Sequence, residues 1–491
     1  MSSAEISRLR IQRRGMTSGR CLFSLLLVGL CLPWLGHAGG AGPPRPNILL
    51  IISDDQGWAD VGWHGTDIKT PHLDKLAAAG AKLEQFYVMP VCSPTRSALM
   101  TGRYPMRQGL QTGVIRPWAD YGLPLEERTL PQALNQAGYT TAICGKWHLG
   151  AHDRAYLPTR RGFDHQYGHY CGAIDYFEHT RDGGFDWHRD DQVCRDQGYT
   201  TFLLATEAVR LIREQPEGKP LFLYVPFNAV HAPHQVPEKY KAPYASLPEP
   251  RRTYAGMVAA MDEAIGQIVA ALDEQGLRQN TLIIFSSDNG GPNPGKVTSN
   301  GPLRAGKGTL YEGGVRVCAC VAWPGRIAPG STINAAIHVV DWYPTLLKLA
   351  GASLEQKLPL DGRDVWPTIT AGKPSPHDEI LLNSEPRRGA IRVGDWKLVL
   401  NGGMPGGEEE GRQAVKKQNV NKARAQDSGE GMELFNLAAD PYEKRNLVTE
   451  QPGKLKELRA RYDALAKQAV PPKSKPMKPG FKPPKVWGEP E

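Results

Sequence analysis

Four apolar runs of strand length, each followed at once by polar residues, constrain the fold of this chain most. They occupy residues 46–52, 139–144, 220–227 and 281–287. Continuous apolar runs of this length are typical of strands that are buried on both faces of a sheet. Helical patterns separate them along the sequence, and this alternation predicts an α/β protein with a mixed, mostly parallel central sheet.

Ionisable and amide side chains follow the ends of these runs. In open α/β sheets, ligands bind just outside the carboxyl ends of the strands. The pattern therefore predicts one cleft that gathers seven side chains: Asp54, Asp55, Lys146, His148, His231, Asp288 and Asn289.

Two of these strand ends carry pairs of oxygen ligands, Asp54-Asp55 and Asp288-Asn289. Carboxylate and amide oxygens suit a hard cation such as calcium or magnesium, and they argue against a structural zinc site. Either pair alone is more simply explained as a turn former at a strand end. Two pairs at equivalent strand ends favour a metal site.

Residues 91–103 form a compact motif with the sequence V-C-S-P-T-R-S-A-L-M-T-G-R. Ser93 can act as a helix N-cap and Pro94 suits the first turn, which would place Cys92 at the positive end of a helix dipole. Arg96 would follow one turn along on the same side. Free amides and a guanidinium beside Cys92 predict an anion site. A lone cysteine would more simply be a core residue.

Further cationic groups surround the expected cleft. Lys146 and His148 share one side of an extended segment, while His231 and Lys307 come from separate loops. Singly, each is more often a surface or hydrogen-bonding residue. Together they supply the cations and proton donors that a sulfate-like transition state requires.

The C-x-P-x-R motif at Cys92, followed by T-G-R at residues 101–103, resembles the signature of the type I sulfatases, in which the cysteine is oxidised to formylglycine (3-oxoalanine). The resemblance covers nearly all of the chain beyond its first 38 residues, and the local motifs are similar to the arylsulfatase B branch, the N-acetylgalactosamine-4-sulfatases. Supporting stretches are D-D-Q-G-W (54–58), G-K-W-H-L-G (145–150), L-P-T-R-R-G-F-D (157–164), S-D-N-G-G (287–291) and D-W-Y-P-T-L-L-K-L-A-G (341–351).

The resemblance implies the alkaline-phosphatase-like α/β sandwich with a small C-terminal antiparallel-sheet domain. It also implies a calcium ion, with the oxidised Cys92 as one ligand. The other implied ligands are Asp54, Asp55, Asp288 and Asn289.

The resemblance further implies that an aldehyde hydrate at Cys92 attacks sulfur, and that its second hydroxyl then expels sulfate from a covalent sulfated enzyme. Arg96 and Lys146 would hold the hydrate, and His148 would assist it. His231 and Lys307 would bind sulfate and protonate the leaving oxygen. Position 307 is matched by spacing and glycines rather than by a rigid motif.

The domain organisation follows from changes in composition. Residues 401–431, which are polar and rich in Gly, Glu and Lys, predict a mobile loop. Residues 390–400 and 433–436 resemble strands of a small antiparallel unit. The expected parts are a signal peptide (1–38), an N-terminal catalytic domain (39–372), a small α+β domain (373–470) and a Pro/Lys-rich extended tail (471–491).

The termini hold most of the net charge of +8. Residues 1–20 carry five Arg and one Glu, and residues 471–491 carry five Lys and two Glu, so the rest is nearly neutral and predicts no nucleic-acid partner. The Arg-rich start, the apolar run at residues 21–35 and Gly36-His37-Ala38 predict a cleaved signal peptide. The run is short and broken by Pro33, so a retained membrane anchor is not favoured.

The cysteines and the missing glycosylation sequons concern the cellular setting. Cys171 and Cys194 flank a polar loop and are the best disulfide candidate, whereas Cys318 and Cys320 lie two apart on a strand-like run and are expected to be core thiols. The chain contains no Asn-x-Ser/Thr sequon. This favours a bacterial periplasmic or secreted protein over a lysosomal one.

Three hypotheses of function are compatible with these residues. The first is a sulfatase acting on sulfated carbohydrate, such as N-acetylgalactosamine 4-sulfate or a related polysaccharide, with a formylglycine-generating enzyme as its maturation partner. The second is a phosphatase or phosphodiesterase of the same superfamily, which would generally need a Ser or Thr nucleophile and a two-metal site. The third is a non-catalytic binder of sulfated glycans. The complete set of candidate catalytic residues favours the first.

Overall fold

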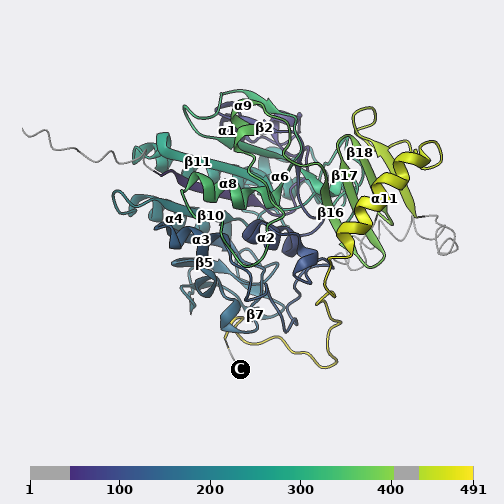
Figure 1. Cartoon of the computed structure of the whole chain (residues 1–491). Coiled ribbons are helices and arrows are strands. Elements are labelled where there is room, and N and C mark those ends of the chain that lie inside the picture. Colours follow the sequence, from purple (N-terminus) through teal and green to yellow (C-terminus); the bar gives the residue numbers. More distant parts are fainter. Residues whose placement is uncertain (1–44, 403–430, 490–491) are drawn as a thin grey trace, which may run out of the picture. The chain divides into compact units, whose positions relative to one another are not determined.

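The computed structural model describes residues 45–402 and 431–489, which belong to one compact unit (Figure 1). The expected signal peptide lies outside the described residues, and so does nearly all of the loop expected at residues 401–431.

A ten-stranded sheet is the centre of the fold. Five adjacent strands run parallel to one another: β11, β1, β10, β4 and β5. Strand β13 lies between β11 and β2 and is antiparallel to both. The mixed, mostly parallel sheet predicted from the sequence is confirmed. Its spatial order is β14 (Ser331–Ile333), β2 (Ala81–Leu83), β13 (Ala319–Ala322), β11 (Thr281–Ser287), β1 (Asn47–Ser53), β10 (Leu221–Pro226), β4 (Thr140–Lys146), β5 (His165–His169), β8 (His188–Arg189) and β9 (Gln192–Val193).

Strand β1 shows why the apolar runs are continuous. Ile48, Leu50 and Ile52 belong to one buried core, whereas Leu49 and Ile51 belong to another on the opposite face. Side chains of a strand alternate between the two faces, so a strand covered on both sides needs apolar residues at every position.

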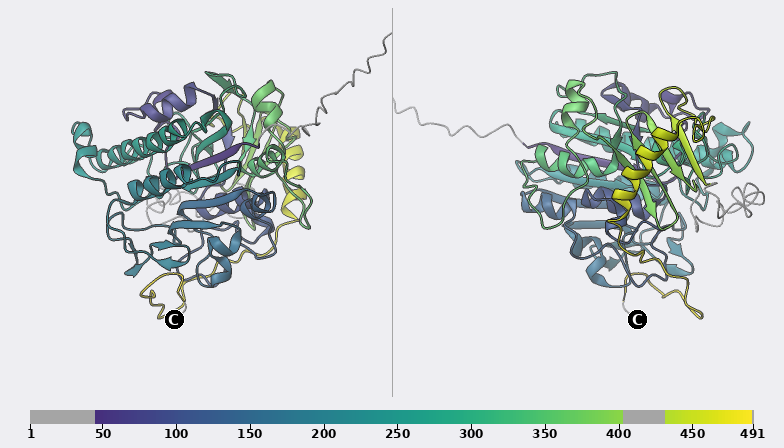
Figure 2. Two further views of the ribbon diagram at one scale, coloured as in Figure 1. Left: turned by 90° about the vertical axis from the view of Figure 1, so that its left-hand side faces the viewer. Right: turned by 45° about the vertical axis from the view of Figure 1, so that its right-hand side comes forward.

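Helices cover both faces of the sheet, which makes the fold a three-layer sandwich (Figures 1 and 2). One core contains residues of α2 (Cys92–Thr101), α3 (Leu130–Gln136) and α8 (Trp342–Leu349). The other contains residues of α1 (Pro71–Ala78), α4 (Thr200–Arg213) and α6 (Arg251–Glu274). Among the described residues, α6 is the one helix long and apolar enough by composition to span a membrane, but it packs in the core against α4, as core helices of globular proteins do.

A second sheet of four antiparallel strands forms the C-terminal part, with α11 (Pro452–Ala466) lying across it (Figure 2). Residues 390–400, which resembled one strand, form two, because Gly394 turns the chain with a φ of 55°. The small antiparallel sheet is confirmed, whereas the domain boundary at residue 372 stays a prediction. Its strands are β16 (Ile380–Glu385), β17 (Arg388–Val393), β18 (Trp396–Leu400) and β19 (Met432–Asn436).

Short elements complete the described structure. A three-stranded sheet contains β12 (Arg316–Val317), β3 (Phe86–Tyr87) and β15 (Ile337–His338), and β6 (Thr180–Arg181) pairs with β7 (Gly184–Phe185). The remaining α-helices of the described residues are α5 (Glu238–Lys241), α7 (Glu312–Val315) and α9 (Trp366–Ala371).

The expected disulfide between Cys171 and Cys194 is wrong, because all six cysteines of the described residues are free thiols. The backbone amide of Cys171 donates to the Asp186 carboxylate, and the backbone amide of Cys194 donates to the carbonyl of Trp187. Packing and hydrogen bonds therefore order this region in place of a disulfide. Cys318 and Cys320 are fully buried in one core, as expected.

Candidate active site

Helix α2 carries Cys92 as its first residue, so the side chain lies at the amide end of the helix. The expected cap by Ser93 is wrong. The N-cap position is Val91, without a side-chain cap, and the Ser93 hydroxyl instead accepts a hydrogen bond from the Ile115 amide at 3.0 Å. Arg96 lies one turn along and is fully buried, as the spacing predicted.

Arg96 and Lys146 bind the carboxylates that follow the two central strands. Arg96 Nη2 lies 2.8 Å from Asp288 Oδ2 and 3.4 Å from Asp54 Oδ2. Lys146 Nζ lies 2.5 Å from the same Asp54 oxygen. Strands β1 and β11 are paired in register up to Ser53 and Ser287, and this pairing places Asp54 and Asp288 side by side.

Asp55 is the centre of a second set of contacts. Its Oδ2 accepts a hydrogen bond from Lys307 Nζ at 2.8 Å and lies 3.6 Å from His231 Nε2. Its Oδ1 accepts from Asn289 Nδ2 at 2.7 Å. The Gly-rich loop therefore brings Lys307 to the cleft, although only its spacing indicated this position.

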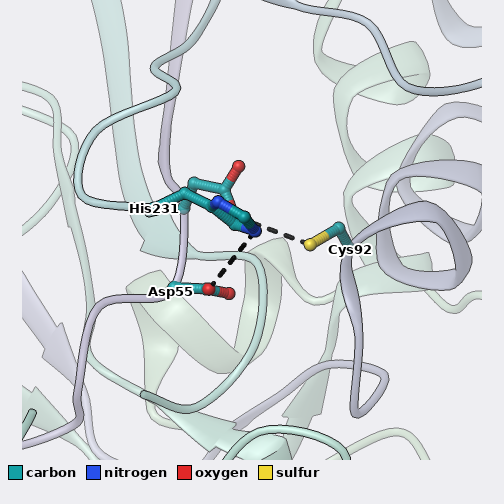
Figure 3. A group of neighbouring side chains, drawn as sticks. Asp55, Cys92 and His231 are labelled. Carbon is teal, nitrogen blue, oxygen red and sulfur yellow. Dashed lines mark hydrogen bonds and ion pairs between the residues drawn. The ribbon is translucent and has the colours of Figure 1, made fainter. Parts of the chain in front are cut away.

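His231 joins the two sets of contacts. Figure 3 shows its imidazole between the Asp55 carboxylate and the sulfur of Cys92. One ligand atom from each of Asp54, Asp55, Cys92 and His231 lies within 4.8 Å of the others, and all four residues are buried. Cys92 Sγ is 3.5 Å from Asp54 Oδ1.

The two central carboxyl groups have opposite pKa shifts. Burial raises the pKa of Asp54, but the nearby charges of Lys146, His231 and Arg96 outweigh it and hold that pKa well below its usual value. Burial and the neighbouring Asp54 carboxylate raise the pKa of Asp288. Two carboxylates this close repel each other, and a cation between them would relieve that repulsion.

Burial raises the pKa of the Cys92 thiol well above its usual value, and the carboxylates of Asp288 and Asp54 raise it further. The thiolate is the reactive form of cysteine, and these surroundings disfavour it in an unmodified Cys92.

His148 lies on the neighbouring wall. Its Nε2 is 3.0 Å from the carbonyl oxygen of Ile115, whose neighbour Val114 packs with Cys92. The backbone is left-handed at two candidate residues, with φ of 57° at His148 and 64° at Asp55. Such conformations are costly for residues other than glycine and gather at functional sites, because packing must hold them there.

Sequence reasoning missed several residues that hold the candidate site. The Tyr176 hydroxyl lies 2.7 Å from the carbonyl oxygen of Asn228 and 2.8 Å from that of His231, and its one hydrogen, donated to either or shared by both, fixes the loop that carries His231. A Cβ at Gly172 would lie 2.4 Å from the His148 ring. The sequence gives no periodic or motif signal for these contacts, since they come from an irregular region.

The donor set fits a hard cation. Asn289 Oδ1 is buried and accepts no hydrogen bond within the described residues, although the Nδ2 atom of the same amide is bonded to Asp55. A buried acceptor without a partner is costly, and a metal ion would satisfy it. The oxygen-rich surroundings match the ligand preference of calcium.

A family model described as "Sulfatase" matches residues 46–352, a span that contains every residue of this site. The chain belongs to the sulfatase family. It is therefore a sulfuric ester hydrolase of the arylsulfatase type, and the resemblance of its motifs to the type I sulfatases is confirmed.

Similar curated sulfatases cover most of the chain. Arylsulfatase J of Mus musculus is 40% identical over 489 residues, which are 92% of this chain and 81% of that protein. N-acetylgalactosamine-6-sulfatase of Mus musculus is 33% identical, over 84% of each chain. Arylsulfatase A of Homo sapiens is 36% identical, over 73% of this sulfatase and 76% of that protein.

Solved structures agree with the fold. The crystal structure of Ps i-CgsB has a TM-score of 0.77 at 32% identity, covering 87% of this chain and 94% of that one, and it was also solved in complex with k-i-k-neocarrahexaose. PsFucS1 sulfatase from Pseudoalteromonas sp. has a TM-score of 0.70 at 27% identity, covering 86% of this chain and 90% of that one. These similarities confirm the alkaline-phosphatase-like sandwich.

Proposed function

We propose that this sulfatase removes sulfate from sulfated carbohydrates, using a formylglycine made from Cys92 and a bound calcium ion. The observation that carries the proposal is the position of Cys92: it is the first residue of α2, fully buried, within 4.8 Å of Asp54, Asp55 and His231. An anion that reaches this point meets the helix amides and several fixed cations.

The oxygen ligands for calcium would be Asp54, Asp55, Asp288 and Asn289, with the oxidised residue 92 beside them. When bound, the ion would neutralise the carboxylates and withdraw charge from a sulfate oxygen. The carboxylates are already oriented by Arg96, Lys146 and Lys307, so the ligands need little rearrangement.

The hydrate of an aldehyde at position 92 would supply one hydroxyl to attack sulfur and a second to release sulfate, which a thiol cannot do. Lys146 and Arg96 reach the cleft from β4 and α2 and would hold this group in a fixed orientation. His148, kept in place by the Ile115 carbonyl, would accept or return a proton on the adjacent wall.

Departure of the alcohol requires a proton donor at the bridging oxygen. His231 and Lys307 both lie against Asp55, at 3.6 and 2.8 Å. Both can bind a sulfate oxygen, and one of them would donate the proton.

The carbohydrate substrate is supported by the named relatives. One similar protein is an N-acetylgalactosamine-6-sulfatase. Another, Ps i-CgsB, was crystallised in complex with k-i-k-neocarrahexaose. The local motifs resemble those of 4-sulfatases. The discriminating panel therefore contains oligosaccharides with a non-reducing-end N-acetylgalactosamine 4-sulfate or 6-sulfate, together with sulfated polysaccharides.

The test is sulfate release by enzyme co-produced with a formylglycine-generating enzyme, with mass spectrometry of the peptide that contains residue 92. We expect the aldehyde at Cys92 and release from at least one member of the panel. Cys92→Ala should lose activity by at least about 10³-fold, because it removes the nucleophile. The matched control is Cys194→Ala, which removes a partly exposed thiol of the described structure and should retain activity.

Full activity of Cys92→Ala would contradict the mechanism. Turnover of phosphate monoesters without turnover of sulfate esters would favour the phosphatase hypothesis, and tight binding of sulfated glycan without any turnover would favour a non-catalytic binder. Export to the periplasm or medium is part of the proposal, since access to a polysaccharide substrate depends on it.

A further inference from the structure

The C-terminal tail packs on chain segments that continue to the candidate active site. Residues 470–488, here named the strap, follow α11 without helical structure. The Val470 amide donates to the carbonyl of Met106, and the Lys473 amide donates to that of Gly109, at 2.9 and 2.8 Å. At its other end the strap pairs with β7, where the Trp487 amide donates to Phe185 O at 2.9 Å.

The strap is anchored rather than loosely attached. The Trp487 side chain is 5% exposed, and its indole nitrogen donates to the carbonyl of Arg181 at 2.8 Å. In the middle, the Trp118 indole donates to the Lys475 carbonyl at 3.3 Å and packs against Phe481. Backbone bonds at both ends hold the lysines of the strap at defined positions.

Both segments under the strap lead directly to His148. The carbonyl of Ile115 accepts from the His148 ring, and only four residues, at most about 18 Å of extended chain from Cα to Cα, separate Ile115 from Asp120, which contacts the strap. On the other side, Gly488 lies against the Tyr170 ring, two residues before Gly172, which contacts His148. The strap therefore packs on the two chain segments that hold His148.

The strap presents a row of cations on its outer surface. Four of its lysines are exposed: Lys475, Lys478, Lys482 and Lys485. Among the described residues, Asp120 is the one carboxylate paired with any of them, at 3.0 Å from Lys475 and 3.8 Å from Lys478. Arg195, also exposed, stacks on Phe185 beside the end of the strap.

We propose that the strap is a second binding site, which holds the anionic groups of a sulfated polysaccharide while another of its sulfate esters occupies the Cys92 cleft. Exposed lysines bind anions weakly one at a time, but a fixed row acts on a polyanion together and raises its local concentration. This proposal rests on the proposed function and adds that the preferred substrate is a chain with several sulfate groups. A small sulfate ester would not reach the strap.

The experiment compares two quadruple variants that remove equal charge. The strap variant carries Lys475→Gln, Lys478→Gln, Lys482→Gln and Lys485→Gln. The control variant carries Lys75→Gln, Lys219→Gln, Lys373→Gln and Lys456→Gln, all exposed lysines in other parts of the described structure. Binding of dextran sulfate is measured by calorimetry at low and high salt, and turnover is measured with the small ester 4-nitrocatechol sulfate.

We expect the strap variant to bind dextran sulfate roughly 10-fold more weakly at low salt, with a smaller difference at high salt because salt screens the charges. The control variant should stay within about 2-fold of the wild type, and both variants should hydrolyse 4-nitrocatechol sulfate at the wild-type rate. Equal weakening in both variants, or no weakening in either, would overturn the proposal.

The quadruple strap variant removes the Lys475–Asp120 ion pair and could detach the strap, so a double variant that keeps this ion pair is tested as well. Lys482→Gln with Lys485→Gln leaves the Lys475–Asp120 ion pair intact and should weaken dextran sulfate binding by about 3-fold. No weakening in this well-anchored variant would also count against the proposal. Binding of dextran sulfate is measured without turnover. The comparison of the variants therefore still tests the strap if the proposed sulfatase mechanism proves wrong.

Discussion

At the residue scale, Asp55 holds two candidate catalytic side chains, Lys307 and His231, in place. The Asp55 carboxylate accepts from Asn289 on one oxygen and from Lys307 on the other, so its orientation is fixed before any substrate arrives. His231, 3.6 Å from the same carboxylate, is held through its carbonyl by Tyr176. The proposed binding of the anion and donation of the proton could therefore fall to different side chains, Lys307 and His231.

This arrangement makes the proton donor testable. Replacement His231→Ala should slow hydrolysis of esters with poor leaving groups, such as sugar sulfates, by about 10²–10⁴-fold, and should slow aryl sulfates of acidic phenols far less, because those leave without a proton. The measurement is kcat/KM against the pKa of the leaving alcohol. The slope should become steeper than in the wild type.

Lys307→Ala is the matched comparison, since Lys307 binds the same Asp55 oxygen. If Lys307 acts only by binding sulfate, its loss should lower kcat/KM by the same factor for every leaving group. A uniform loss for His231→Ala and a steeper slope for Lys307→Ala would reverse the two roles.

Nine of the ten candidate site residues could be predicted because each of them follows a strand, begins a helix or lies in a motif, whereas Lys307 was indicated only by spacing and glycines. Asp54 and Asp288, for example, come together because parallel strands end at the same edge of the sheet. Gly172, Ile115 and Tyr176 could not be predicted in this way. They act through backbone carbonyls or through close packing, and these contacts depend on the path of irregular segments that carry no periodic pattern.

At the scale of elements, a buried ionic cluster joins the small sheet to the loop that carries Lys307. Glu312, the first residue of α7, accepts from Tyr87 at 2.8 Å and pairs with Lys397 of β18 at 2.8 Å. Lys397 also lies 2.8 Å from Glu443, which accepts the Glu312 amide. All four side chains are buried, so an unbalanced charge among them is costly.

The cluster predicts a pH dependence of stability. Burial raises the pKa of Glu443 from 4.5 to about 7, although Lys397 opposes the rise. Because the carboxyl pKa is raised in the folded state, the contribution of Glu443 to stability is fully present below the unfolded pKa of 4.5. This contribution is lost as the pH rises through about 7. This shift corresponds to on the order of 3 kcal/mol.

Glu443→Gln keeps a neutral side chain at every pH and so should remove this dependence. The free energy of unfolding, measured by urea titration, should be similar in variant and wild type near pH 5, and the variant should be the more stable above pH 8. If the two curves stay parallel between these values, Glu443 is not the group responsible.

The elements themselves were largely predictable, and the exceptions have a local cause. Strand β11 covers the same residues as its apolar run, since it is buried from end to end. The turn at Gly394 was missed because apolar residues continue on both sides of it, and the small sheet buries them in both strands. The false disulfide followed from loop composition, which says nothing about the distance between two thiols.

At the scale of the whole molecule, the order of the strands in the sheet and the path of the strap could not be predicted from the sequence. Strand β1 pairs with β10 and β11, which lie far along the chain, and the strap reaches β7 across about 300 residues of sequence separation. Such pairings depend on the packing of all layers together. Because of these pairings, the candidate active site is assembled from segments that lie far apart in the sequence.

Calcium should therefore stabilise the molecule as a whole. The proposed ligands follow β1 and β11, the two strands at the centre of the large sheet, and Asp55 is also bonded to Lys307, whose loop contacts the small sheet through Leu310. A ligand that binds only the folded state adds about 4 kcal/mol at a thousand times its Kd. Removing it should leave Arg96 and Lys146 as the cations that offset the repulsion between Asp54 and Asp288.

We expect chelation to lower Tm by several degrees and to abolish turnover, with calcium restoring both and Tm rising with the logarithm of the free calcium concentration. Asn289→Leu removes the buried acceptor that has no other partner in the described structure, and it should flatten this dependence. Asn135→Leu, at an exposed amide on α3, is the control and should keep the calcium response. A Tm that is independent of calcium in active, aldehyde-bearing enzyme would show that another cation, or none, occupies the cluster, and scanning calorimetry with magnesium would decide between these two outcomes.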